Sequence, residues 1–142
     1  MNILFAFISL IFSLQGHSIN NKQKAKSILL DIMFQDFFKN DTLDLEINNI
    51  SIVEKMALNS NTAGFTHLHL DISQWNSNTL KISFLDKCKY SSSSKKITLV
   101  LHLNGRERRI ILDWHKGKFV GLSKKDVNDF YLMQQNVPFV YE

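Results

Sequence analysis

The chain has 142 residues, of which 44% are hydrophobic and 21% are charged, and its formal net charge is +4 at pH 7. This length suits one domain with a real core, and a count of only five Gly and one Pro excludes a collagen-like or disordered chain. The single cysteine, Cys88, excludes an internal disulfide and a paired-cysteine metal motif.

The first eighteen residues predict an export signal. Residues 3–14 form an uncharged apolar run that is shorter than the roughly 20 residues needed to span a bilayer, and Gly16-His17-Ser18 fits a cleavage pattern. The stretch resembles the export signals of Gram-negative envelope proteins, many of which end in a similar "LFSLQG". We therefore expect a signal peptide over residues 1–18, one domain over residues 19–142, and a periplasmic or extracellular protein. An uncleaved anchor and a buried first helix are the alternatives.

Residues 20–39 predict a helix. Apolar side chains recur there at the spacing of one helical face: Ala25, Leu29, Ile32, Met33 and Phe37. The segment is so apolar that most of the helix is expected to be covered by a sheet. Asn40-Asp41 is expected to end it.

From residue 42 the apolar period changes to two, which predicts about seven short antiparallel strands in five segments: 42–55, 65–73, 78–90, 96–115 and 118–122. Asn48-Asn49 and Asn104-Gly105 suit the two-residue turns of hairpins. Cys88 alternates in step with Leu80, Ile82 and Phe84, so burial is favoured over a reactive or intermolecular role.

A second helix is expected to begin at Ser123. Asp126 follows three residues later, as in a variant of the capping box, and Val127, Phe130 and Tyr131 would share the inner face. The helix is expected to end near residue 136, ahead of Pro138. The predicted fold class is therefore α+β: an N-terminal helix, an antiparallel sheet of about seven short strands, and a C-terminal helix packed on the sheet.

The segment "FTHLHLDI" at residues 65–72 carries the most direct candidate for chemistry. Because residues two apart in a strand share a face, His67, His69 and Asp71 are expected to lie together while the intervening apolar residues enter the core. Two imidazoles and a carboxylate suit Zn²⁺ or a similar ion. The alternative is that these three residues have no site function and simply form the solvated face of a half-buried strand.

Residues 66–71, "THLHLD", resemble the Thr-His-x-His-x-Asp-His signature of the metallo-β-lactamase superfamily. Ile72 stands where that signature has its next His, and the chain is too short for the family's four-layer αββα fold. We therefore reject membership of that family and keep only the three polar residues as a candidate site.

Positive charge gathers in the later half of the chain. Arg106, Arg108 and Arg109 lie on one predicted hairpin, where guanidinium groups suit an anionic glycan, lipid head group or acidic protein. The alternative is a solvated hairpin that its charges protect from edge-to-edge pairing. His102, opposite Glu107, and His115, near a turn, are expected to be surface residues.

These features predict a small exported domain with a non-catalytic binding or accessory role in the cell envelope. The alternatives are a metal-binding protein or metal-dependent hydrolase that uses the His-x-His-x-Asp strand, and a membrane-tethered structural protein. No cofactor is expected for a binding or accessory role. Zn²⁺ or a similar divalent metal is expected for a metal-binding protein or metal-dependent hydrolase. The expected partner is a protein or an anionic surface ligand. Nucleic acid is not expected, because no known binding module is present, and membrane contact is expected only through an uncleaved N-terminal segment.

Overall fold

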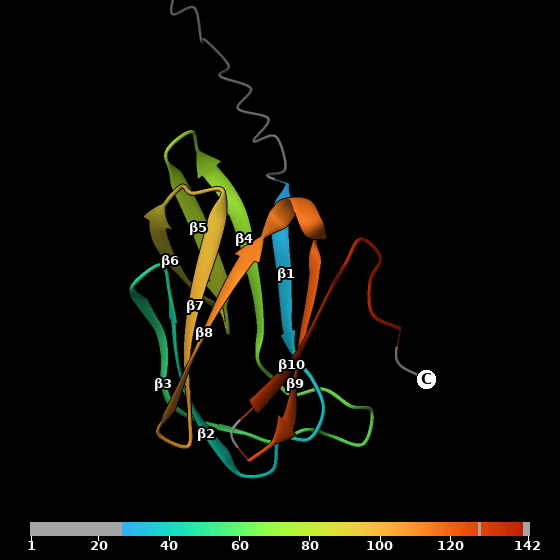
Figure 1. Ribbon diagram of the computed structural model, residues 1–142. Coiled ribbons are helices and arrows are strands. Elements are labelled where there is room, and N and C mark those ends of the chain that lie inside the picture. Colours follow the sequence, from blue (N-terminus) through green and yellow to red (C-terminus); the bar gives the residue numbers. More distant parts are fainter. Residues whose placement is uncertain (1–26, 128, 141–142) are drawn as a thin grey trace, which may run out of the picture.

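The computed structural model describes residues 27–127 and 129–140, which form two β-sheets (Figure 1). The elements are β1 (Ile28–Phe34), β2 (Asp41–Ile47), β3 (Ile50–Leu58), β4 (His69–Asn76), β5 (Thr79–Phe84), β6 (Lys87–Ser92), β7 (Lys96–Leu103), β8 (Arg106–Asp113), the short 3₁₀ helix η1 (Trp114–Lys116), β9 (Phe119–Asp126) and β10 (Asp129–Gln135).

One sheet has six strands in the order β10-β9-β1-β4-β5-β6, and the other has four in the order β3-β2-β7-β8. Neighbouring strands are antiparallel except for β1 and β9, which run parallel. This parallel pair attaches the β9-β10 hairpin to β1, so that β1 lies inside the sheet between β9 and β4. Side chains two apart on β1 and β4 therefore share one outer surface.

The core lies between the two sheets. Fully buried side chains alternate along the strands of both: Leu30, Ile32 and Phe34 of β1, Leu70 and Ile72 of β4, Leu43, Leu45 and Ile47 of β2, and Leu99 and Leu101 of β7. Burying each such side chain contributes about 1.5–3 kcal/mol. This alternation sends the polar residues of β1 and β4 to the outer face of the six-stranded sheet.

The predicted N-terminal helix is wrong over the residues that the structure describes. Residues 28–34 form β1, in which Leu30, Ile32 and Phe34 are buried and the residues between them are half-buried. A central strand that is covered on one face and half-covered on the other is apolar at almost every position. A buried helix is apolar in the same way, so both periods fit "ILLDIMF".

The predicted C-terminal helix is also wrong. Its residues form β9 and β10, which pair antiparallel. Ser123 does not cap a helix; it is buried within β9, where its Oγ lies 3.5 Å from Oε1 of Gln35. The described residues contain no α-helix, and the α+β fold class must be replaced by a two-sheet, all-β fold.

The expected burial of Cys88 is wrong as well, because residues 78–90 form two strands and not one. Leu85 and Asp86 both have positive φ, 41° and 58°, and reverse the chain between β5 and β6. Cys88 then pairs with Ser83 and is exposed.

The two predicted Asn turns are confirmed. Asn48 and Asn49 have φ of 50° and 63° between β2 and β3. Asn104 and Gly105 have φ of 51° and 81° between β7 and β8.

The segment predicted as a signal peptide, residues 1–18, lies outside the described residues. Within the described residues, no helix has the length and apolar character needed to cross a membrane.

Candidate metal centre

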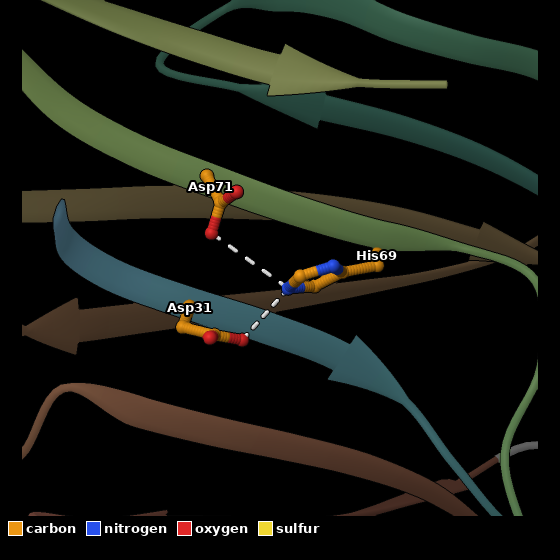
Figure 2. A group of neighbouring side chains, drawn as sticks. All are labelled: Asp31, His69 and Asp71. Atoms are coloured by element: carbon orange, nitrogen blue, oxygen red, sulfur yellow. Dashed lines mark hydrogen bonds and ion pairs between the residues drawn. The ribbon is translucent and has the colours of Figure 1, made fainter. Parts of the chain in front are cut away.

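Three polar side chains meet on the outer face of the six-stranded sheet. β1 and β4 pair antiparallel with Asp31 directly opposite Asp71 and Met33 opposite His69. The alternation of both strands turns Asp31, His69 and Asp71 away from the core. Figure 2 shows the Asp31 side chain from β1 and the other two from β4 pointing toward one another.

The potential ligand atoms of this group lie close together. Nε2 of His69 is 2.8 Å from Oδ1 of Asp31 and 3.7 Å from Oδ1 of Asp71. One ligand atom from each of the three residues lies within 4.8 Å of the other two. We call Asp31, His69 and Asp71 the acidic triad.

The negative charge of the two carboxylates in the acidic triad is only partly compensated by neighbouring groups. Like charges directly opposite each other on paired strands are unfavourable, and Asp31 and Asp71 are such a pair. Oδ1 of Asp71 is buried and accepts no hydrogen bond from the described residues. Burial raises the pKa of Asp71, and Asp31 adds to the rise while His69 and Lys118 oppose it. A buried carboxylate oxygen without a donor calls for a cation or a water molecule.

Only two of the three residues predicted as metal ligands belong to the acidic triad. β4 begins at His69, and the preceding residues follow a different path: Thr66 N donates to Phe34 O at 2.8 Å, and Leu68 N donates to Thr66 Oγ1 at 3.1 Å. His67 is therefore off the strand and exposed. It is not part of the triad.

Asp31 takes the place of His67, and sequence reasoning missed it. Its signal was a single charged residue within the otherwise apolar "ILLDIMF". In the predicted helix, Asp31 would lie on the solvent-facing side. In a strand that pairs with β4, the same residue must face a neighbour across the sheet.

An open depression of about 600 Å³ lies beside the acidic triad. His69 and Asp71 form part of its wall, and the rest is mixed in character: His67, Lys81, Ser83, Phe84, Leu85, Asp86, Lys87 and Cys88. A ligand or a solvent molecule can therefore reach the triad from the sheet surface.

Two carboxylates and one imidazole are suitable donors for Zn²⁺, with bond lengths of about 2.0–2.2 Å. Two donors of a tetrahedral ion at that bond length are about 3.4 Å apart. The two distances from His69 Nε2, 2.8 Å to Asp31 Oδ1 and 3.7 Å to Asp71 Oδ1, bracket this value. Small side-chain rotations would bring the three donors around one ion and leave room for a solvent molecule as the fourth ligand.

The arginines predicted to bind an anion do not all face the same way. Arg106, Arg108 and Arg109 all lie on β8, an edge strand, where alternation places Arg109 on the opposite face from the other two. Nε of Arg108 lies 3.8 Å from Oδ1 of Asp129 on β10, so an acid already neutralises part of this charge.

The remaining candidate side chains make local contacts. Nε2 of His102 lies 4.0 Å from Oε2 of Glu107, its predicted cross-strand partner. Nδ1 of His115 lies 2.9 Å from Oδ1 of Asp113. Elsewhere on the six-stranded sheet, the exposed Trp75 packs edge-on against Tyr90 with the ring centroids 5.3 Å apart.

Comparisons of the chain with protein family models, with curated proteins and with solved structures find no match.

Proposed function

We propose that the protein is a β-sandwich binding domain that takes up one divalent metal ion at the acidic triad of Asp31, His69 and Asp71. Zn²⁺ is the preferred ion, because the donor set contains an imidazole nitrogen as well as carboxylate oxygens. The role is binding, since cation uptake needs only the three donors that the sheet brings together.

The main support for the proposal is the environment of the Asp71 carboxylate. Its Oδ1 atom is buried without a hydrogen-bond donor among the described residues, and Asp31 stands directly across from it. A divalent ion would neutralise both carboxylates at once and supply the missing partner to Oδ1 of Asp71.

A protonated His69 is the competing explanation. The imidazolium would form an ion pair with Asp31 at 2.8 Å and offset part of the negative charge. Nε2 is 3.7 Å from Oδ1 of Asp71, however, which is too long for a hydrogen bond, so that oxygen keeps no donor. A metal ion satisfies all three groups, whereas the imidazolium satisfies only one carboxylate well.

Thermal unfolding of the full chain, produced without a His tag, separates the two explanations. An ion that binds only the folded state stabilises it by about 2.7 kcal/mol at 100 times its Kd. We expect Zn²⁺ to raise the unfolding midpoint by several degrees and EDTA to reverse the rise. Asp71→Asn and His69→Gln should each abolish this gain.

His67→Ala is the matched control, because His67 is a nearby exposed imidazole that lies outside the acidic triad. It should keep the full metal-dependent rise. An unfolding midpoint that does not respond to Zn²⁺, Mn²⁺ or Ca²⁺ would leave the ion pair of His69 and Asp31 as the explanation of the triad.

A further inference from the structure

The four edge strands of the two sheets differ in how they are protected. An exposed edge offers unpaired backbone groups to other strands, and proteins discourage such pairing with charged side chains or bulges. Three of the edges have such protection. β6 carries Lys87 and Lys89, β8 carries three Arg and Glu107, and β3 carries Glu54 and Lys55 with irregular register against β2.

β10, the fourth edge, has little such protection of its own; Arg108 of β8 forms an ion pair with Asp129 at the start of the strand, at 3.8 Å, and Arg108 and Arg109 line one hollow with Leu132. Its sequence is "DFYLMQQ", with no Lys or Arg and with its one acid, Asp129, at the first position. From Phe130 to Gln135 it pairs in regular register with β9. Among the described residues no strand pairs with its other edge.

The side chains in the middle of β10 are apolar and exposed. Tyr131 is 55% exposed, and Leu132 and Met133 are each 38% exposed. Tyr131 and Met133 also border an open hollow of about 480 Å³, together with Phe37, which is 74% exposed, and with the charged Asp36, Lys124 and Lys125. Exposed apolar side chains on an unpaired strand edge are typical of an interaction surface.

We propose that β10 pairs with β10 of a second copy of this chain, antiparallel about a two-fold axis through Leu132, so that two six-stranded sheets become continuous. A two-fold interface uses the same surface on both copies, and strand addition at a sheet edge supplies backbone hydrogen bonds. This inference is independent of the metal site.

The register that follows from this axis is self-complementary. Leu132 faces its own copy, Tyr131 faces Met133, Phe130 faces Gln134, and Asp129 faces Gln135. These pairs place no like charges opposite each other, and Tyr131–Met133 is an aromatic–apolar pair that occurs twice, on the outer face. The charge and side-chain pattern of β10 therefore fits a second copy of itself.

Sedimentation equilibrium of the full chain tests the pairing. A seven-residue strand pair is a small interface, so we expect a dimer with Kd in the range of about 1–100 µM. Tyr131→Lys combined with Met133→Lys places lysines opposite lysines and should weaken the dimer at least about tenfold. Ile111→Lys, at a 59% exposed position on the edge strand β8, is the matched control and should leave Kd unchanged.

A charge-swapped variant tests the register itself. Tyr131→Lys combined with Met133→Glu places each introduced Lys opposite an introduced Glu of the other copy. This variant should dimerise at least about tenfold more tightly than the double-lysine variant, and added salt should reduce the difference. Circular dichroism would check that both variants fold. A wild-type chain that stays monomeric up to about 1 mM, or double-lysine and charge-swapped variants with equal Kd, would overturn the proposal.

Discussion

Asp31 on β1 and Asp71 on β4 are direct cross-strand partners on the outer face of the six-stranded sheet. This placement sets two carboxylates against each other across the β1–β4 strand pair. His69 lies beside both and contacts Asp31 more closely than Asp71. The stability of the metal-free protein and its affinity for a cation should therefore respond in opposite directions to changes at Asp71.

Asp71→Asn should stabilise the metal-free protein. The change removes one of two facing like charges and a carboxylate whose buried oxygen has no donor among the described residues. We expect the free energy of unfolding at pH 7 in EDTA to rise by about 0.5–1 kcal/mol, measured by urea denaturation. The same variant should lose the stabilisation by Zn²⁺. A loss of stability in EDTA would contradict the description of this pair as unfavourable.

Acid should weaken the fold through Asp41. Burial raises the pKa of Asp41, but hydrogen bonds from Lys124, Asn104 and the backbone N–H of Lys39 outweigh it and leave the pKa below its usual value. The ionised form is thus favoured in the folded state. Its stabilisation is fully present above the unfolded pKa of about 3.9 and is lost as pH falls through the lower, folded pKa.

Asp41→Asn tests this contribution. Nζ of Lys124 lies 2.7 Å from Oδ1 of Asp41, and both residues are largely buried, so the substitution leaves an ammonium group without its partner. We expect a loss of about 3 kcal/mol at pH 7 and a smaller loss near pH 3, measured by denaturant unfolding at both values. Equal losses at the two pH values would exclude this ion pair as a source of acid sensitivity.

Two glycines with positive φ should differ in their tolerance of a methyl group. Gly105 has φ of 81° in the β7-β8 turn, and an added Cβ would meet no atom within 4 Å. Gly117 has φ of 148°, and an added Cβ would lie 2.6 Å from the backbone of Gln135 on β10. Gly105→Ala should therefore cost about 1 kcal/mol of unfolding free energy, from backbone strain alone.

Gly117→Ala should lower the free energy of unfolding by about 3 kcal/mol or more, because the clash of the added Cβ with the Gln135 backbone displaces β10 from the end of the 3₁₀ helix. Gln134 normally donates hydrogen bonds there, from Nε2 to the carbonyl oxygens of Asp113 and Gly117. Thermal unfolding of both variants checks the order. Equal costs at the two positions would mean that the close approach of Gly117 and Gln135 is not a constraint.

Cys88 should react in the native protein. The turn at Leu85 and Asp86 places its thiol on the outer face of the sheet, where it is exposed. We expect a thiol reagent such as DTNB to label the folded protein at a rate within about tenfold of the unfolded rate. Protection of several hundredfold would contradict the position of β6.

The turns at Asn48-Asn49 and Asn104-Gly105 were predictable from the sequence, whereas the turn at Leu85-Asp86 and the strand conformation of the two segments predicted as helices were not. Asn104-Gly105 favours positive φ at both positions, so local chemistry fixes the hairpin in which His102 faces Glu107. In contrast, "ILLDIMF" satisfies the helical and the strand period equally. Its conformation depends on pairing with β9, some 85 residues later in the chain, which no local pattern records.

Only the local part of the candidate site was predictable, because its completion also depends on long-range strand pairing. His69 and Asp71 share a face because they are two apart in one strand, and this follows from the sequence alone. Asp31 joins them only through the β1–β4 register, and His67 leaves them because the strand starts after it. Long-range pairing, and not local propensity, decides which residues complete the site.

Isothermal titration of Zn²⁺ into the metal-free, untagged full chain at pH 7 tests whether the acidic triad binds a metal ion. We expect one ion per chain for the wild type and for His67→Ala. We also expect a drop in affinity of at least about 100-fold for Asp31→Asn, His69→Gln and Asp71→Asn, each of which removes one of three donors. No saturable heat in the wild type, or binding that survives all three substitutions, would contradict metal binding at the acidic triad.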